Sequence, residues 1–401
     1  MAQKITKWLE KYWFIASGLL LFGLYLYGYQ KMYFHQDDLD WFLMAQRPFW
    51  QVINFPIGDH VNYLFRLLIK FEWEVFHFNF PSYLMVSTLM HAVVVWLLYD
   101  LASQTSKRKD LAAIVALIFT INTNWTEAIL WTSGQTISIT AIFVLLAMQA
   151  MWKQKFQAVA LFLASWTSAL AIGLIGATAI VFEKMRVKAI LVGLILGLIY
   201  FWKGTDGTAI EYGTKWLFNV FVVWGLAIIN TVIGRLFIPF DRFEILRICL
   251  VCLMVILAVW KWRFKLKEIW NDTLTRFLLL QIVLYYLIVA AGRAQYGIGI
   301  MRAERYAYLG LVLCLLLMVR ILRKVKIGNW IWILPVIILI QSIGLYRRAE
   351  DYIVRPQQLK ILVNEIRKSG ISEEKYEEYL PHFVLNDERL KYRDLMILLN
   401  D

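Results

Sequence analysis

Two adjoining stretches near the start of the chain decide the fold: YWFIASGLLLFGLYLYGYQKMY, residues 12–33, and FHQDDLDW, residues 34–41. The first is apolar for long enough to cross roughly 30 Å of hydrocarbon as a helix. The second carries three aspartates, Asp37, Asp38 and Asp40, within four positions. Because charged groups are costly in lipid, this junction predicts a membrane-spanning helix that ends at an acidic segment just outside the bilayer.

The rest of the chain repeats the apolar pattern. Of 401 residues, 60% are hydrophobic and 18% are charged, against about 25% charged in a soluble domain. The apolar runs are continuous, whereas the strands of a membrane barrel would alternate. Since lipid offers no partner to free backbone groups, the runs must be helices. The sequence therefore predicts an all-α polytopic membrane protein.

The basic residues predict its orientation. The net charge of +13 is divided into short clusters between apolar runs, which is the positive-inside pattern and not that of a nucleic-acid-binding face. We expect an integral protein of the plasma membrane or an equivalent membrane, with an uncleaved signal anchor and a cytoplasmic N-terminus. The expected cytoplasmic clusters are Lys4/Lys7/Lys11, Lys107/Arg108/Lys109, Lys153/Lys155, Lys184/Arg186/Lys188, Lys261/Arg263/Lys265/Lys267 and Arg320/Arg323/Lys324/Lys326.

With these clusters inside, the apolar runs give about eleven crossings and an extracytoplasmic C-terminus. Residues 217–240, LFNVFVVWGLAIINTVIGRLFIPF, are long enough to cross, but they would carry Lys261 and the later clusters to the outside. We interpret them as a re-entrant or interfacial element on the outer side; a twelve-span arrangement is the alternative. The predicted spans are 12–33, 81–103, 111–122, 136–152, 156–168, 170–182, 189–203, 244–260, 272–292, 306–322 and 328–346.

Two segments form the expected outer face. The loop 34–80 lies within a transmembrane domain of residues 1–346, and residues 347–401 predict a tail of two or three short helices. The loop contains a pattern typical of an amphipathic helix in the interface plane. Its apolar positions are Leu64, Leu67, Leu68, Phe71, Val75 and Phe78, with Arg66, Lys70, Glu74 and His77 on another face.

The outer segments carry candidate acid–base residues. Asp37 and Asp38 are adjacent carboxylates, which suit the deprotonation of a hydroxyl or the binding of a divalent cation such as Mg²⁺ or Mn²⁺. The alternative is that one of them caps a helix N-terminus, where negative charge is favoured. Glu127 is a lone carboxylate between two short spans, close to Trp131. That indole would stack on a sugar ring or belong to the interfacial aromatic belt.

Three late arginines oppose the positive-inside trend. Arg293, Arg302 and Arg305 are expected on the outer side, where a phosphate ligand would explain them because guanidinium groups match phosphate oxygens. Ion pairing with Glu304 or with other outer carboxylates is the alternative. The outer loop adds His60 and Arg66. No Walker loop or HExxH pattern supports nucleotide-driven pumping or zinc proteolysis.

Three stretches, in this order, carry a family resemblance. The first runs from Phe65-Arg66-Leu67 to Leu89-Met90-His91-Ala92, with Ser87 where an Asn is expected. The second is Trp125-Thr126-Glu127-Ala128-Ile129 followed by Gly134-Gln135, with Gln135 in place of an Arg. The third is Ala303-Glu304-Arg305-Tyr306-Ala307-Tyr308. Together they resemble the GT-C glycosyltransferases, within them the protein O-mannosyltransferases and the transmembrane O-mannosyltransferases that carry tetratricopeptide repeats.

The resemblance implies a function. The chain would transfer a sugar from a polyprenyl-phosphate-linked donor to a protein or glycan acceptor on the outer face, with inversion at the anomeric carbon. Asp37 or Asp38 would deprotonate or orient the acceptor hydroxyl, and Glu127 would position sugar or acceptor. The partners would be these substrates and membrane lipids. The lipid phosphate would be bound by Arg293, Arg302 and Arg305, and other substrate atoms by His60, Arg66, Trp131 and Tyr308.

One stretch of the chain departs from the family pattern, and two other function classes are alternatives to this interpretation. Trp166-Thr167-Ser168-Ala169 stands where the family often has Ser-Lys-Glu, so the acceptor is not identified. A lipid-linked glycan polymerase or ligase would also place arginines at lipid phosphates. A lipid or ion transporter would place its charges near the midplane, on broken helices. The candidate charges at the outer ends of spans favour an enzyme.

Overall fold

The computed structural model describes residues 2–54, 62–203, 214–228, 243–262, 270–294, 304–325 and 333–369, with 235, 238–239, 395–396 and 398–399. Every element within these ranges is a helix, which confirms the predicted all-α class. The α-helices are α1 Ala2–Lys31, α2 Gln36–Ala45, α3 Phe49–Asn54, α4 Tyr63–Phe76, α5 Phe80–Ser106, α6 Lys109–Thr120, α7 Thr126–Leu130, α8 Gln135–Trp152, α9 Gln157–Thr167, α10 Ile172–Val181, α11 Glu183–Lys203, α12 Thr214–Leu226, α14 Glu244–Trp262, α16 Thr273–Arg293, α17 Glu304–Leu322 and α18 Ile333–Ser369. Three short 3₁₀ helices are η1 Thr123–Trp125, η2 Thr132–Gly134 and η3 Ala169–Ala171.

The boundaries of α5 follow from local sequence. Pro81 lies in the first turn, where its missing N–H has no helical partner to lose. Lys107 ends the helix in the left-handed conformation, with φ at 58° and its N–H donated to the Ser103 carbonyl. The left-handed residue redirects the chain, so α6 begins two residues later and returns alongside α5.

Within the described ranges, five helices are long and apolar enough to cross a membrane. A sixth candidate is α6 with residues Thr123–Leu130, a pair bent by 60°. The chain is therefore an integral membrane protein, while the count of about eleven crossings stays a prediction. Helix α12 covers the first part of 217–240, and residues 229–234, 236–237 and 240 lie outside the described residues, so the re-entrant course also stays a prediction. The five are Lys7–Lys31, Phe80–Ser106, Thr132–Trp152, Thr273–Arg293 and Arg305–Leu322.

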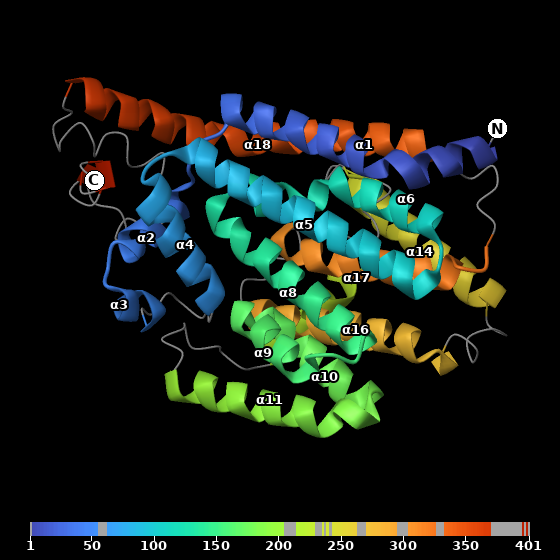
Figure 1. Ribbon diagram of the computed structural model, residues 1–401. Coiled ribbons are helices and arrows are strands. Elements are labelled where there is room, and N and C mark those ends of the chain that lie inside the picture. The colour runs from blue at the N-terminus through green and yellow to red at the C-terminus, as the bar shows by residue number, and fades with distance from the viewer. Residues whose placement is uncertain are drawn as a thin grey trace.

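The helices stack in order across the molecule (Figure 1). Helices α1 and α18 form one edge, where the Tyr27 hydroxyl donates to Glu350 at 2.8 Å. Next come α5 and α6, then α8, α9, α16 and α17, and then α10, which packs against α11 at the opposite edge. The short helices α2, α3 and α4 gather at one end of the bundle. We call this the Asp38 end, because α2 carries that residue.

Several helix ends meet at the Asp38 end of the bundle. The starts of α5 and α8 meet at the Asp38 end, where Gln135 contacts Ser87. The end of α16 and the start of α17 meet there too, since the Tyr285 hydroxyl donates to the Tyr306 carbonyl at 2.9 Å. The first and last helices, α1 and α18, run parallel. Their contacts show this, because Tyr27 meets Glu350 and the Lys31 carbonyl meets Gln357 one to two turns further along both helices.

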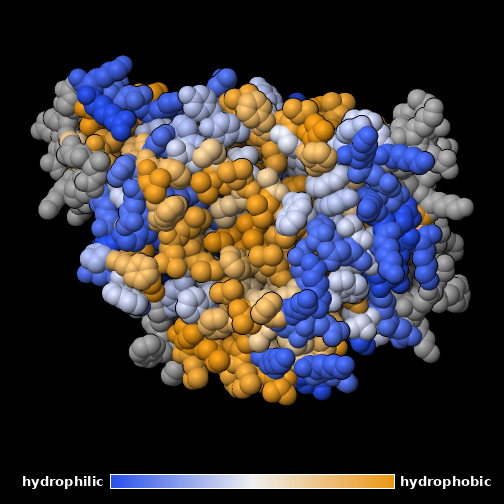
Figure 2. Space-filling view, viewed as in Figure 1, coloured by the Kyte–Doolittle hydropathy of each residue, from blue (hydrophilic) through white to orange (hydrophobic). Residues whose placement is uncertain are grey.

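A broad apolar zone lies between polar ends (Figure 2). Large side chains stand exposed on its helices, including Leu19 at 68%, Trp96 at 57% and Leu198 at 68% exposure. Such a continuous apolar surface would be a liability in water. In hydrocarbon it is the expected contact surface, so the surface supports membrane insertion independently of helix length.

Helix α18 is longer than a membrane span. Its 37 residues measure about 55 Å at 1.5 Å per residue. It passes without a break through the predicted boundary at 346/347, and Pro356 lies inside it. The start of the predicted tail thus continues the helix that contains most of the last predicted span. The dipeptide Ser369-Gly370 predicts a break in the tail, and α18 ends at Ser369. Asn386 or Asp387 would cap a final predicted helix, which would begin outside the described residues.

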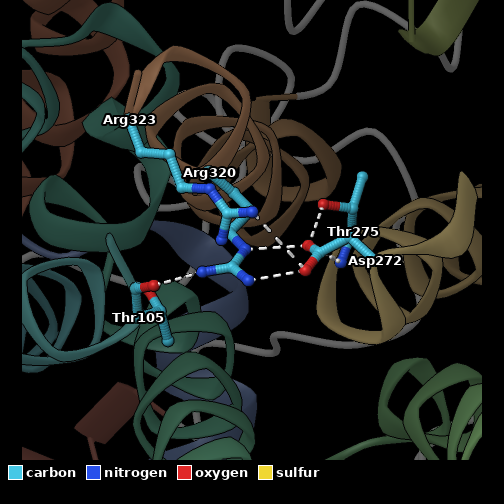
Figure 3. Close-up of polar contacts among 5 residues, drawn as sticks. All are labelled: Thr105, Asp272, Thr275, Arg320 and Arg323. Atoms are coloured by element: carbon cyan, nitrogen blue, oxygen red, sulfur yellow. Dashed lines mark hydrogen bonds and ion pairs between the residues drawn. The ribbon is translucent and has the colours of Figure 1, made fainter. Parts of the chain in front are cut away.

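The end of the bundle opposite Asp38 is fastened by a charged cluster (Figure 3). Asp272 caps α16 by accepting from the Thr275 backbone N–H at 3.1 Å and from its hydroxyl. Arg320 of α17 donates to both Asp272 oxygens at 2.8 and 2.6 Å and to the Thr105 carbonyl of α5. Arg323 lies 3.8 Å from the same carboxylate. Chiefly through the Arg320 hydrogen bonds, this surrounding holds the pKa of Asp272 well below its usual range.

Replacing Arg320 with Gln should lower the free energy of unfolding by about 2–3 kcal/mol at pH 7, because charged hydrogen bonds to Asp272 are lost. The folded-state pKa of Asp272 is depressed, so this contribution is present above its unfolded pKa and is lost as the pH falls. Wild-type and variant stabilities should therefore begin to converge as the pH falls below about 4, and they should become equal only below the depressed folded-state pKa of Asp272. Denaturation in detergent micelles measures both.

The control is Glu74→Gln, which removes the 60%-exposed partner of Lys70. An exposed pair contributes about 0–1 kcal/mol, so this variant should unfold close to wild type. Equal destabilisation by Arg320→Gln and Glu74→Gln would contradict a fastening role for Arg320.

Candidate functional site

Asp38 is fully buried at the start of α2. Its Oδ2 accepts from the His35 backbone N–H at 2.8 Å, which caps the helix. Its Oδ1 accepts from the backbone N–H and from the hydroxyl of Ser133, both at 2.8 Å. The helix-cap alternative therefore holds for Asp38, but the same carboxylate also joins α2 to a turn that lies 95 residues further along the chain. Asp40 is partly buried on the same helix, and the Asp37 side chain lies outside the described atoms.

The turn that meets Asp38 requires a glycine. Ser133 and Gly134 belong to η2, between α7 and α8. A Cβ on Gly134 would lie 2.0 Å from the Glu127 carbonyl oxygen, which is far inside van der Waals contact. Only glycine lets the turn approach α7 this closely. The resulting fold places the Asp38 partner Ser133 against the short helix that carries Glu127.

Glu127 binds two other parts of the chain. It lies on α7 with 8% of its surface exposed. Its Oε2 accepts from the Arg305 backbone N–H at 3.0 Å, and its Oε1 accepts from the Tyr352 hydroxyl at 2.5 Å. The first bond satisfies an N–H in the opening turn of α17, which has no partner within the helix. Glu127 thus ties together α7, α17 and α18.

Arg305 is surrounded by aromatic rings. Its guanidinium carbon lies 5.3 Å from the Trp131 ring centre and 5.4 Å from that of Tyr306. His35 and Tyr352 continue the aromatic group, with the His35 ring 6.0 Å from Trp131 and 5.8 Å from Tyr352. No ion pair joins the Arg305 guanidinium to a carboxylate among the side chains that the structure describes. The Trp131 indole N–H is buried and has no hydrogen-bond partner among those side chains.

These contacts bring four predicted residues into one place. Asp38, Glu127, Trp131 and Arg305 come from separate segments and meet around η2 and the start of α17; we call them the Asp38 site. Arg293 borders it, because its guanidinium carbon lies 6.0 Å from the Tyr306 ring centre.

Other predicted residues lie elsewhere. The Arg66 guanidinium donates to the Asn62 side chain at 3.2 Å and to the Ile53 carbonyl at 2.9 Å, both within the outer loop. Tyr308 is fully buried and shares a 2.8 Å hydrogen bond with His91 inside the bundle. Both side chains thus have hydrogen-bond partners within the chain, and their binding of substrate stays a prediction. His60 and Arg302 lie outside the described residues.

Helix α4 packs into the protein through the face opposite its predicted apolar stripe. The predicted apolar stripe remains on the surface at Phe71 and Val75, which are 60% and 53% exposed, as an interfacial helix requires. The opposite face packs into the protein and carries Glu72 and Arg66 with it. The sequence signal for this was the spacing of Phe65, Ile69 and Trp73, which places Glu72 on the same face.

Glu72 forms a second buried layer behind Asp38. Its Oε1 accepts from the Gln135 amide at 3.1 Å, and that amide also contacts Ser87 at 3.0 Å. Its other oxygen is buried without a hydrogen-bond partner among the described residues. Burial, with a smaller contribution from the charge of Asp38 and opposed by the Gln135 bond, raises the pKa of Glu72 to about 8. Gln135 thus holds this carboxyl, and Ser87 helps to position the Gln135 amide.

Glu72 should make stability depend on pH. Its folded-state pKa of about 8 exceeds the unfolded value of about 4.3, so the folded protein binds the extra proton between these values. The contribution of this group to the free energy of unfolding should fall by about 4 kcal/mol as the pH rises from 5 to 9. The variant Glu72→Gln keeps the shape of the side chain but cannot ionise. It should remove most of this slope in thermal unfolding between pH 5 and 9, and an unchanged slope would show that Glu72 is not the group responsible.

The hydrogen bonds that Asp38 already accepts affect how well it could bind the predicted metal ion. Three donors already occupy the two Asp38 oxygens, which leaves little capacity for a cation. Among the described residues, no group of three His, Cys, Asp or Glu side chains could hold a metal ion. The side chain of Asp37, the other proposed ligand, lies outside these residues. Asp38 thus fits a metal ion poorly, and the binding of Mg²⁺ or Mn²⁺ by this pair stays a prediction.

Comparisons of the chain with family models, with curated proteins and with solved structures find no match. The assignment of the Asp38 site therefore depends on its residues and their geometry.

Proposed function

We propose that this protein transfers a sugar from a polyprenyl-phosphate donor to an acceptor hydroxyl at the Asp38 site. The observation that carries the proposal is Arg305. Its guanidinium is stacked on two aromatic rings, has no described carboxylate as an ion-pair partner, and lies beside two buried carboxylates at the end of a membrane-embedded bundle. A cation held in this way fits an anionic group of an incoming ligand.

The donor phosphate would bind at Arg305. A polyprenyl chain keeps its phosphate at the membrane surface, and Arg305 begins a candidate span at that level. The buried Trp131 N–H adds a second donor next to the guanidinium. In the reaction the bond between the anomeric carbon and the phosphate oxygen breaks, and negative charge grows on the leaving phosphate. Fixed donors at that point stabilise the transition state.

The acceptor hydroxyl would approach from the Asp38 side. Its oxygen forms the new bond to the anomeric carbon on the face opposite the leaving phosphate, which inverts the configuration. The hydroxyl proton passes to the carboxylate of Asp38, which the His35 and Ser133 donors hold in place. Glu127, held by Tyr352 and by the Arg305 backbone, fixes the start of α17 and so positions the guanidinium. No step requires a nucleotide or a metal ion.

Binding of the carrier lipid tests the donor assignment. Purified protein in micelles would be mixed with a polyprenyl phosphate or with the matching polyprenol, and the bound lipid counted by native mass spectrometry. We expect the phosphate to be retained at least tenfold better than the alcohol. Equal retention of both would show that the protein recognises only the hydrocarbon chain and would overturn the assignment.

A further inference from the structure

A second candidate site lies at the end of the bundle away from Asp38. It is a cavity of about 790 Å³ between the ends of α5, α8 and α10 and the starts of α11 and α16. Helix α8 runs from Gln135 at the Asp38 site to Trp152 at this cavity, a distance of about 26 Å along the axis. The cavity is therefore separate from the proposed transfer site.

The cavity walls combine cations with apolar side chains. The charged lining residues are Lys184 and Lys188, one turn apart on α11, Arg276 on α16, and a single acid, Glu183. The apolar part of the wall is made by Leu101, Met148, Met151, Trp152, Val181, Phe182, Met185, Leu274, Phe277, Leu278 and Leu316. An amphiphile with an anionic headgroup matches both parts, whereas a small hydrophilic anion would use only the first.

Arg276 distinguishes this cavity from an ordinary basic surface. Its Nε is buried and has no hydrogen-bond partner among the described residues. Asp272, one turn earlier on the same helix, is already occupied by Arg320, Arg323 and Thr275. The acid nearest to Arg276 along its helix is thus paired with arginines from another part of the chain. A buried guanidinium N–H without a partner is costly, and a ligand oxygen in the cavity would satisfy it.

The cavity is also held open by fixed elements. Thr105 and Thr273 line it. Arg320 joins Thr105 of α5 to Asp272, the residue before Thr273 at the start of α16 (Figure 3). A site with a fixed frame loses little conformational entropy when a ligand binds.

We infer that this cavity binds an anionic phospholipid, with the phosphate at Arg276, Lys184 and Lys188 and an acyl chain along the Met148–Phe277 side. Gln154 and Gln157 at the rim offer amides to a glycerol headgroup. Since this is a binding site at the opposite end of the bundle, it does not depend on the proposed glycosyl transfer.

The test uses the full chain purified in detergent. Phosphatidylglycerol, phosphatidylcholine or soluble glycerol 3-phosphate would be added, and bound molecules counted by native mass spectrometry. We expect one phosphatidylglycerol to survive delipidation, with phosphatidylcholine retained at least tenfold less. Equal retention of the two lipids would overturn the inference. Binding of glycerol 3-phosphate as tight as that of phosphatidylglycerol would overturn the lipid assignment and show a site for free phosphate esters.

Two double variants, each of which removes two positive charges, distinguish binding in the cavity from attraction to the basic surface around it. Lys184→Gln with Lys188→Gln removes two exposed cavity lysines, which leaves the packed core unchanged, and should lower phosphatidylglycerol retention at least fivefold. Lys107→Gln with Lys109→Gln removes two exposed lysines that do not line the cavity and should leave retention unchanged. Arg276→Gln should reduce retention further. Equal losses in both double variants would show non-specific attraction to a basic surface and would contradict the inference.

Discussion

The variant Asp38→Asn should lose sugar transfer by about 10²–10⁴-fold, the range that a positioned general base contributes. The amide cannot take the acceptor proton. It also turns an N–H₂ group toward either His35 or Ser133, both of which donate to Asp38 in the wild type. The measurement is the initial rate of transfer from a radiolabelled polyprenyl-phosphate sugar, with thermal unfolding recorded on the same preparation to separate lost chemistry from lost structure.

Two controls accompany Asp38→Asn. Asp40→Asn removes the same charge from the same helix, two residues along, and should retain transfer within a few-fold. Ser133→Ala removes one of the three donors to Asp38 but keeps the carboxylate, so the rate should fall about tenfold at most. If the Asp38 and Asp40 variants transfer equally well, Asp38 is a helix cap and not the base.

The variant Arg305→Gln should lose transfer by about 10²–10³-fold, the range for removing one donor that stabilises developing charge. Arg305→Lys keeps the positive charge. It loses the planar fork and the stacking on Trp131 and Tyr306, so we expect it to recover only part of the loss. The readout is the rate of transfer at saturating and at limiting donor, because loss of phosphate binding and loss of leaving-group stabilisation affect these differently.

A matched arginine serves as the control for Arg305. Arg367 is exposed on α18, and its guanidinium carbon lies 6.0 Å from the Phe78 ring centre. Arg367→Gln removes one stacked cation without touching the Asp38 site and should transfer at the wild-type rate. Equal losses in the Arg305 and Arg367 variants would point to a general effect of charge and not to a phosphate at Arg305.

Local patterns predicted the helices of this fold well. The span predicted at 81–103 is the helix Phe80–Ser106, and that at 272–292 is Thr273–Arg293. These boundaries follow from residues within one turn of them, such as Pro81 or the cap Asp272. The extent of α18 was not predicted, because polar residues after 346 suggested an end to the span. A helix that leaves the membrane needs no apolar surface to continue.

The four members of the Asp38 site could be predicted from the sequence, but their partners could not. Asp38, Glu127 and Arg305 stood out because charges beside apolar runs are unusual, and Trp131 because it lies close to Glu127. Ser133 and Tyr352 did not stand out, because nothing in their own segments marks them. Tyr352 lies 225 positions from Glu127, to which it donates, and such a contact exists only once the helices are packed. Glu72 was hidden by the apolar stripe on the lipid-facing side of α4.

The most direct test of the central claim is the product of a single transfer reaction. Purified protein in lipid nanodiscs would be given a polyprenyl-phosphate sugar of known anomeric configuration and a hydroxyl-bearing acceptor extract, and the linkage in the product determined by NMR. The proposed reaction predicts a glycoside of inverted configuration, formed by the wild type and reduced at least 100-fold in both Asp38→Asn and Arg305→Gln. A product of retained configuration, or the same yield from all three proteins, would contradict direct displacement at the Asp38 site.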